Sequence, residues 1–205
     1  RIAVIILYFI LKGRDPMDII CYDFDKTVYH GDSSTHFTLW CLRHYPKTWL
    51  HLPAMAGWSL LYACKIVKKT LFKSHLFGYL KFLSDPQKSV DLFWQSHEQN
   101  LKAWYLAKDH SRDVIISASP TFLLEGVCRR LGVLSLLATP MDPRTGRIHG
   151  ENCWGEEKVC RLNGWNPDSH LLEFYSDSYS DTPLARLADK AFLVEGDLLK
   201  PWEKF

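Results

Sequence analysis

A pair of carboxylates directly after a short apolar run limits most strongly what this chain can fold into. The apolar residues at 19–22 are followed by Asp23 and Asp25. In an extended chain, side chains two positions apart point the same way, so both carboxylates can converge at the carboxyl end of a strand. Ligands bind at that place in an open α/β sheet. Because two adjacent carboxylates repel each other, we expect a bound divalent cation or a proton on one of them.

Composition is that of an ordinary globular protein. The 205 residues are 47% hydrophobic and 23% charged, which suits one good-sized domain or a core with an inserted module. The formal net charge of +2 is too small to indicate a nucleic-acid partner. The six cysteines include no C-x-x-C pair. We therefore expect reduced thiols in a cytosolic protein rather than a zinc site or a disulfide framework.

Short apolar runs alternate with helical stretches along the chain. Buried parallel strands are predicted at 114–116, 136–139, 171–175 and 191–194. Helices are predicted at 122–131, 156–162 and 184–189, and a hairpin turn at 142–147. Strands and helices in alternation require right-handed crossovers, which predicts an α/β fold with a Rossmann-like, doubly wound parallel sheet.

The segment 34–88 differs from this pattern, because it is aromatic, poor in strands and helical in spacing. We predict an α-helical cap there, inserted into a catalytic core formed by 17–33 and 89–205. Such a cap can exclude water and select the substrate. Residues 1–16 form an N-terminal extension without an assigned role. Its apolar run is shorter than the roughly 20 residues that span a bilayer, and Met17 is the expected start.

Three more candidate sites follow later in the chain. Ser117 stands at the end of a predicted strand, Lys158 lies near the start of a predicted helix, and Asp177 and Asp181 follow the strand at 171–175. Each has an ordinary structural explanation when taken alone. These explanations are a helix N-cap, a solvated lysine and an acidic turn. Together, however, they follow the first two carboxylates in a fixed order, and this order favours a shared functional site.

That order and those residue types resemble the four motifs of the haloacid dehalogenase (HAD) superfamily of phosphatases. The motifs here are Asp23-x-Asp25-x-Thr27, Ser117, Lys158 and Asp177-x-x-x-Asp181. The insertion after the first motif resembles the helical cap of subclass IB, the branch that includes phosphoserine phosphatase. The resemblance implies a phosphatase that acts on a small phosphorylated metabolite.

The resemblance also implies a role for each motif residue. Asp23 would be the nucleophile that forms an aspartyl-phosphate, and Asp25 the general acid and then the general base. Mg²⁺ would be held by Asp23, the main-chain carbonyl of Asp25 and Asp177, with Asp181 as a further ligand or as an orienting residue.

The phosphoryl group would be bound by hydroxyl and ammonium donors. The resemblance gives this task to Ser117 and Lys158, and Thr27 would brace the loop and contact the phosphate. Phosphoserine phosphatases carry a Glu that contacts the substrate amine at the position of Asp32. The shorter Asp32 is therefore a candidate substrate contact, and phosphoserine itself is an alternative substrate.

Two other functions are weighed against a phosphatase for small metabolites. The stretch 49–64 has no charged residue, and Lys65, Lys69 and Lys73 follow at four-residue steps. An apolar helix followed by a basic stripe can lie on an anionic membrane, and some relatives in this branch dephosphorylate phosphatidylglycerophosphate. A packed cap with solvated lysines is the favoured explanation. We accordingly expect a cytoplasmic protein, with a peripheral membrane location as the alternative.

The last alternative is a non-catalytic protein that binds phosphorylated ligands. Loss of a key carboxylate would be its sign, and none is lost here. A carbon-halogen hydrolase is disfavoured because Asp25 is present. The sequence makes no prediction of oligomeric state.

Overall fold

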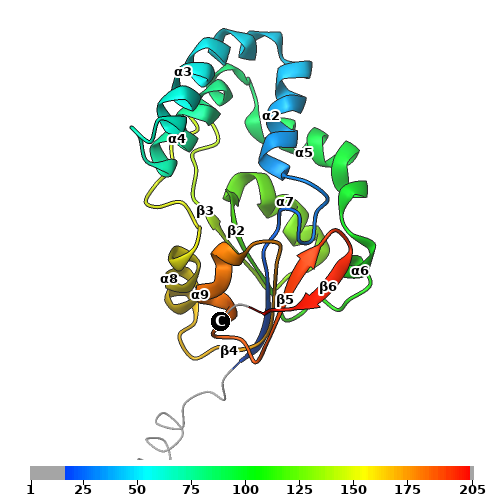
Figure 1. Ribbon diagram of the computed structural model, residues 1–205. Helices are drawn as coiled ribbons and strands as arrows, with labels where there is room; N and C mark the ends of the chain where they lie inside the picture. Colours follow the sequence, from blue (N-terminus) through cyan, green and yellow to red (C-terminus); the bar gives the residue numbers. More distant parts are fainter. Residues whose placement is uncertain (1–16, 204–205) are drawn as a thin grey trace, which may run out of the picture.

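The computed structural model describes residues 17–203, and the predicted N-terminal extension 1–16 lies outside the described residues. A sheet of six strands forms the lower part of the molecule (Figure 1), in the order β3-β2-β1-β4-β5-β6. The strands are β1 (Asp18–Tyr22), β2 (Asp113–Pro120), β3 (Ser135–Thr139), β4 (His170–Ser176), β5 (Lys190–Glu195) and β6 (Leu198–Pro201). All neighbouring pairs are parallel except β5 and β6. The predicted α/β fold is confirmed.

Helices cover both faces of this sheet. Successive side chains of a strand point to opposite faces, so a central strand packs against both helical layers. In β1, Tyr22 packs with α5 (Pro86–His97) and α7 (Thr121–Leu131), whereas Ile19 and Cys21 pack with α8 (Glu156–Trp165) and α9 (Thr182–Ala185). The short helix α6 (Ala103–Leu106) lies on the same face as α5 and α7. The helix α7 ends where Gly132 adopts a left-handed φ of 75°, as its sequence predicts.

One predicted helix is misplaced. The sequence predicts a helix at 184–189, but α9 covers only Thr182–Ala185 and the chain is already turning after it. Pro183 stands in the first turn of α9, where proline is well tolerated, so the helix begins earlier than expected. The backbone N–H of Asp189 donates to the carbonyl of Leu171 in β4 at 3.0 Å. Residue 189 therefore already lies beside the sheet and leads into β5.

The upper part of the molecule is helical (Figure 1). Its elements are α2 (Ser33–His44), the 3-10 helix η1 (Pro46–His51), α3 (Leu52–Ala63), α4 (Lys69–Leu76) and the 3-10 helix η2 (Phe77–Phe82). Prolines stand at the starts of η1, α3 and α5. Residue 88, where the sequence places the end of the cap, falls inside α5, whose Phe93 packs on Phe37 of α2.

The helix α3 packs lightly and has no buried residue. Its contacts with α4 are ring stacks, Tyr62 on Phe72 with centroids 4.5 Å apart and Trp58 on His75 at 3.7 Å. No helix within residues 17–203 is long and apolar enough to cross a membrane.

A loop after β3 contacts the helical part of the molecule. An antiparallel bridge between Met141 and Ile148 encloses the predicted turn. The backbone N–H of Ile148 donates to Oγ of Ser74 in α4 at 3.1 Å. Gly146 has a φ of +76°, and a Cβ there would lie 2.5 Å from the carbonyl of Phe77. Only glycine allows the loop backbone to approach η2 this closely.

Candidate active site

Asp23 and Asp25 stand directly after β1, at the carboxyl end of the sheet. The backbone N–H of Asp23 donates to the carbonyl of Tyr175 in β4 at 2.9 Å, which fixes the start of the loop. The next turn needs a left-handed residue, and Lys26 supplies it with a φ of 58°. A cavity of about 170 Å³ lies at this point. Among its lining residues are Asp23, Asp25, Asp32, Lys158, Asp177 and Asp181.

A buried ammonium joins two of these carboxylates. Nζ of Lys158 lies 2.7 Å from Oδ1 of Asp23 and 2.6 Å from Oδ2 of Asp181. The hydroxyl of Ser176 donates to the same Oδ2 of Asp181 at 2.7 Å. Oδ1 of Asp181 is buried and has no hydrogen-bond partner within residues 17–203. Lys158 therefore offsets the charge of both carboxylates.

Burial dominates the electrostatics of this group. Desolvation raises the pKa of Asp23 to about 7, Lys158 opposes that rise, and Asp181 adds to it. Desolvation alone would lower the pKa of Lys158, but the two carboxylates outweigh it and hold that pKa above its ordinary value. Lys158 therefore stays an ammonium at neutral pH.

Asp25 has a different environment, made of hydroxyl and amide donors. Its Oδ1 accepts from the backbone N–H of Ser33 at 2.6 Å, and its Oδ2 accepts from the hydroxyl of Ser119 at 2.5 Å. Ser34 also contacts the Ser119 hydroxyl, at 2.8 Å. Burial raises the pKa of Asp25, Asp32 raises it further, and the bonds from Ser119 and Ser33 oppose the rise. The protonated form of Asp25 is favoured more than that of an exposed carboxyl.

Ser119 and Ser33 are site residues that the sequence analysis did not name. A signal for Ser119 was present, because it stands two residues after Ser117 at the end of the same strand. Ser117 itself is buried, and its Oγ accepts from the backbone N–H of Ser119 at 3.0 Å. Neither Ser117 nor Thr27 is among the residues that line the 170 Å³ cavity.

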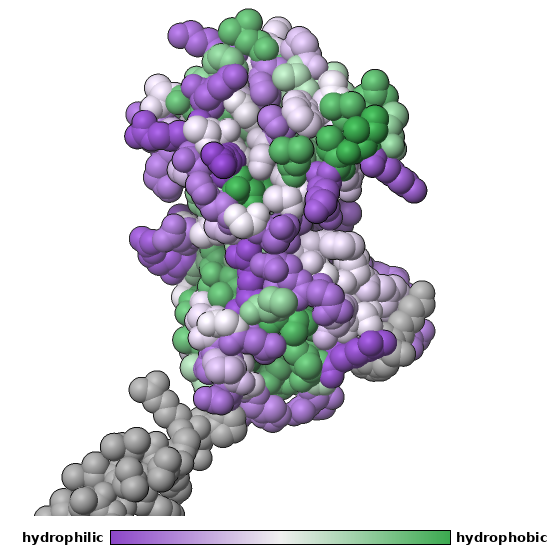
Figure 2. Space-filling model, turned by 90° about the vertical axis from the view of Figure 1, so that its left-hand side faces the viewer, coloured by the Kyte–Doolittle hydropathy of each residue, from purple (hydrophilic) through white to green (hydrophobic). Residues whose placement is uncertain are grey.

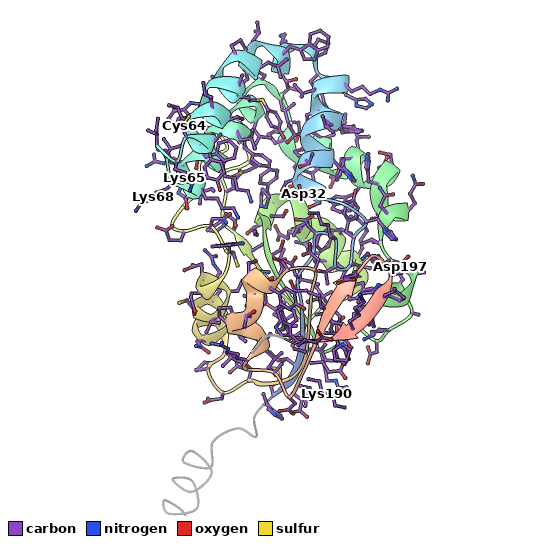
Figure 3. All side chains as sticks on the ribbon, viewed as in Figure 1. Asp32, Cys64, Lys65, Lys68, Lys190 and Asp197 are labelled. Atoms are coloured by element: carbon purple, nitrogen blue, oxygen red, sulfur yellow. The ribbon has the colours of Figure 1, made fainter. Side chains whose placement is uncertain are left out.

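Thr27 and Asp32 hold the loops around the site. Oγ1 of the fully buried Thr27 accepts from the backbone N–H of Asp177 at 3.0 Å, so it ties two motifs together. Burial raises the pKa of Asp177. Asp32 caps α2, accepting from the backbone N–H of Thr35 at 2.7 Å. Figure 3 shows Asp32 below α2, between the helical part and the sheet.

A buried lysine braces the same loop from the opposite side. Nζ of Lys102 donates to the main-chain carbonyl of Lys26 at 2.6 Å and also to the carbonyl of Gly196, in the turn between β5 and β6. The side chain of Lys102 is 1% exposed. The loop that carries Asp25 is thus fixed to the far edge of the sheet.

A larger cavity of about 450 Å³ adjoins the first, and Asp25, Asp32 and Ala118 line both. The rest of its wall is mostly apolar and comes from α2, α3, α4 and η2. Those apolar residues are Leu39, Leu42, Met55, Tyr62, Phe72, Leu76 and Phe77. Lys69 and Lys73 of α4 are its cations.

The prediction that Lys65, Lys69 and Lys73 share one helical face is wrong. The helix α3 ends at Ala63, and Lys65 follows with a left-handed φ of 58°, so it does not share a helix with Lys69 and Lys73. The predicted alternative of solvated lysines also fails for Lys73, whose Nζ donates to the carbonyl of Ala118 at 2.5 Å. Lys65 and Lys68 lie at the outer edge of the helical part (Figure 3).

The oxygen atoms of the site suit a hard cation. Within residues 17–203, no three His, Cys, Asp or Glu side chains are already grouped around one metal position. The carboxylates of Asp23 and Asp177 nevertheless line one small cavity, beside the buried and unpartnered Oδ1 of Asp181. Carboxylate and carbonyl oxygens with no nitrogen or sulfur among them are the ligands that Mg²⁺ prefers.

Two curated proteins are similar to this chain in sequence. Protein CicA of Caulobacter vibrioides is 27% identical over 194 residues, which are 87% of this chain and 86% of CicA. The histidinol-phosphatase of Neisseria meningitidis is 30% identical over 96 residues, 41% of this chain and 43% of that enzyme.

Solved structures share the fold. A protein of unknown function from Bordetella pertussis superposes with a TM-score of 0.68 at 22% identity, over 86% of this chain and 89% of that one. A HAD family hydrolase from Salmonella enterica gives 0.62 at 13% identity, over 84% and 61%. The family model for haloacid dehalogenase-like hydrolases matches residues 20–186. This chain belongs to the haloacid dehalogenase-like hydrolase family.

Proposed function

We propose that this hydrolase is a phosphatase, which hydrolyses phosphate monoesters through an aspartyl-phosphate on Asp23 with the help of Mg²⁺. The contrast between two carboxylates carries the proposal. Asp23 is paired with the Lys158 ammonium, which favours its ionised form, whereas Asp25 accepts hydrogen bonds from the neutral groups of Ser33 and Ser119. Paired carboxylates with unlike environments divide nucleophilic and acid-base work.

The first step transfers the phosphoryl group to the enzyme. An Oδ atom of Asp23 attacks phosphorus while the bond from phosphorus to the leaving oxygen breaks. Protonated Asp25 gives its proton to that oxygen, so the leaving group departs as an alcohol. In the second step Asp25 takes a proton from water, whose oxygen attacks the same phosphorus and releases phosphate and the Asp23 carboxylate.

Mg²⁺ held by Asp23, the main-chain carbonyl of Asp25 and Asp177 would offset the repulsion between the nucleophile and the phosphoryl oxygens. Asp181 is assigned an orienting role, because both of its hydrogen-bond donors are side chains of this site.

Donors to the phosphoryl oxygens come from Lys158 and Ser117. The Ser117 hydroxyl already accepts from the backbone of Ser119, which orients its own O–H for donation. Thr27 braces the loop. The helices at 34–88 serve as a cap over the core at 17–33 and 89–205. We propose a cytoplasmic compartment, in which the six cysteines would stay reduced.

An assay with purified protein and p-nitrophenyl phosphate tests this function. We expect turnover that requires Mg²⁺ and that Asp23→Asn abolishes, because an amide cannot act as the nucleophile. Absence of turnover in the wild type, or full turnover in Asp23→Asn, would contradict the proposal.

A second candidate is a phosphatase that acts on lipid phosphates at a membrane surface. The 450 Å³ cavity beside Asp25 is mostly apolar, which favours an apolar substrate over phosphoserine. Figure 2 shows hydrophobic side chains exposed on the cap. Exposed apolar residues there include Trp49, Leu50, Leu60 and Ile66. Residues 33–84 carry Lys and Arg but no Asp or Glu, a charge that suits an anionic bilayer.

Flotation with vesicles of anionic phospholipid distinguishes the two candidates. Co-flotation that Leu60→Ser with Ile66→Ser abolishes supports the membrane site. If the protein stays at the bottom of the gradient, the membrane candidate is rejected and the candidate with a soluble substrate remains.

A further inference from the structure

Two lysines of α4 reach down toward the active site from the cap. Lys69 and Lys73 are one helical turn apart, so they share a face of α4, and both line the 450 Å³ cavity. Nζ of Lys73 donates to the carbonyl of Ala118 at 2.5 Å and to Oδ1 of Asn152 at 3.3 Å. Nζ of Lys69 lies 4.5 Å from the ring centroid of Trp154. All of these contacts are to uncharged groups.

Neither ammonium has a carboxylate partner. Within residues 17–203, no Asp or Glu oxygen lies within ion-pair distance of Lys69 or Lys73. Removing an ammonium from water without an anion beside it is unfavourable. Burial accordingly lowers the pKa of Lys73 to about 8, against the more distant charges of Asp25 and Asp32. An ammonium has three N–H donors, so Lys73 retains one for a further acceptor.

The position of Lys73 relates it to the leaving group of the substrate. Its acceptor, the carbonyl of Ala118, stands between Ser117 and Ser119, and Ala118 lines both cavities. The two cavities meet at Asp25 and Ala118, so a phosphate monoester with its phosphoryl group at Asp23 has room to extend its leaving group toward Lys73. The other charges facing this path are Asp25, protonated when the first step begins, and Asp32, whose charge the N-terminus of α2 offsets.

We propose that Lys69 and Lys73 form a second anion site, which selects phosphate monoesters whose leaving group carries a negative charge of its own. The inference rests on the phosphomonoesterase function proposed above. The chemical class is a monoester with a carboxylate or phosphodiester near the scissile oxygen and an apolar part beyond it. The apolar part occupies the wall formed by α2, α3 and α4.

A matched pair of soluble probes tests this site. The leaving groups of 3-carboxyphenyl phosphate and 3-carbamoylphenyl phosphate have similar shape and differ by one negative charge. We expect the wild-type enzyme to prefer the carboxylate probe by about tenfold or more in kcat/KM, as a charge-assisted hydrogen bond in a partly buried site allows. The variants Lys69→Met and Lys73→Met lower this ratio toward one, and Lys73→Arg retains it.

Lys68→Met is the matched control. Lys68 directly precedes Lys69 but lines a separate cavity and not the 450 Å³ one, so its loss leaves the ratio unchanged. A wild-type ratio near one overturns the anion site. So does an equal loss for both probes in Lys73→Met and Lys69→Met, which reveals residues that only anchor the cap. Failure of the underlying function is distinct, because neither probe is then hydrolysed with Mg²⁺.

Discussion

Lys158 and Asp181 form a buried ion pair with 2.6 Å between Nζ and Oδ2, and both side chains are almost fully enclosed. The pair stands behind Asp23, the proposed nucleophile, because the same ammonium also contacts that carboxylate. Asp181 thus fixes the direction in which Lys158 presents its charge. Its contribution to catalysis acts through another side chain.

Asp181→Asn should therefore lower kcat by about 10–100-fold, the usual effect of losing an orienting partner. The measurement is steady-state turnover of p-nitrophenyl phosphate at saturating Mg²⁺. Ser176→Ala removes only the hydroxyl that supports Asp181 and should cost less. Wild-type kcat in Asp181→Asn would show that Lys158 needs no such support.

Asp25→Asn should separate the two chemical steps. Nitrophenolate leaves readily without a proton, so Asp23 can still be phosphorylated, but the amide cannot take a proton from the attacking water. We expect a burst of nitrophenolate equal to the enzyme concentration and then very slow turnover in rapid-mixing experiments. Steady turnover without a burst, at an appreciable rate, would assign the base to another residue.

Gly146→Ala should destabilise the protein by about 2–4 kcal/mol. The new methyl group would be forced into the Phe77 carbonyl, and an L-residue at a φ of +76° adds strain. Gly57 in α3 is the control, since no atom lies within 4 Å of a Cβ there. Gly57→Ala should stabilise by about 0.5–1 kcal/mol. Urea unfolding gives both values, and equal stabilities of the two variants would contradict the close approach at residue 146.

Asp113→Asn tests a pH effect far from the catalytic carboxylates. Asp113 is buried at the start of β2, 2.8 Å from Nδ1 of His110, and burial raises its pKa despite His110. A carboxyl with a raised pKa in the folded state stabilises the protein below its unfolded pKa of about 3.9, and that stability is lost as the pH rises through the folded value.

The variant has no such loss, so its free energy of unfolding relative to wild type should increase from pH 4 to pH 7. Urea unfolding at a series of pH values measures the difference. A difference that stays constant across this range would mean that burial does not disfavour the Asp113 carboxylate.

The sheet could be predicted because its strands are buried on both faces and therefore read as apolar runs, as in 114–116 of β2. The strand β6 was missed for the opposite reason. All four of its residues are exposed at the edge of the sheet, so no hydrophobic pattern marks it. Asp23 and Asp25 could be singled out because their spacing directly after the apolar run of β1 is a property of the sequence itself.

The direction of Lys73 could not be predicted in this way. It depends on the angle between α4 and the core, which follows from the left-handed turn at Lys65 and from the approach of Gly146 to Phe77. Ser33 is a similar case, since its backbone N–H meets Asp25 only because the chain returns to the site before α2 begins. Contacts that depend on how different segments are arranged in space leave no periodic signal in the sequence.

The bond from Lys102 to the carbonyls of Lys26 and Gly196 has a consequence for the order of events during synthesis. The loop with Asp25 leaves the ribosome early, whereas the turn at Gly196 leaves it late, just before β6. The Lys102 ammonium gains its second carbonyl partner only after that turn has been made. The support of the Asp25 loop is therefore completed late in synthesis, although the loop itself is made early.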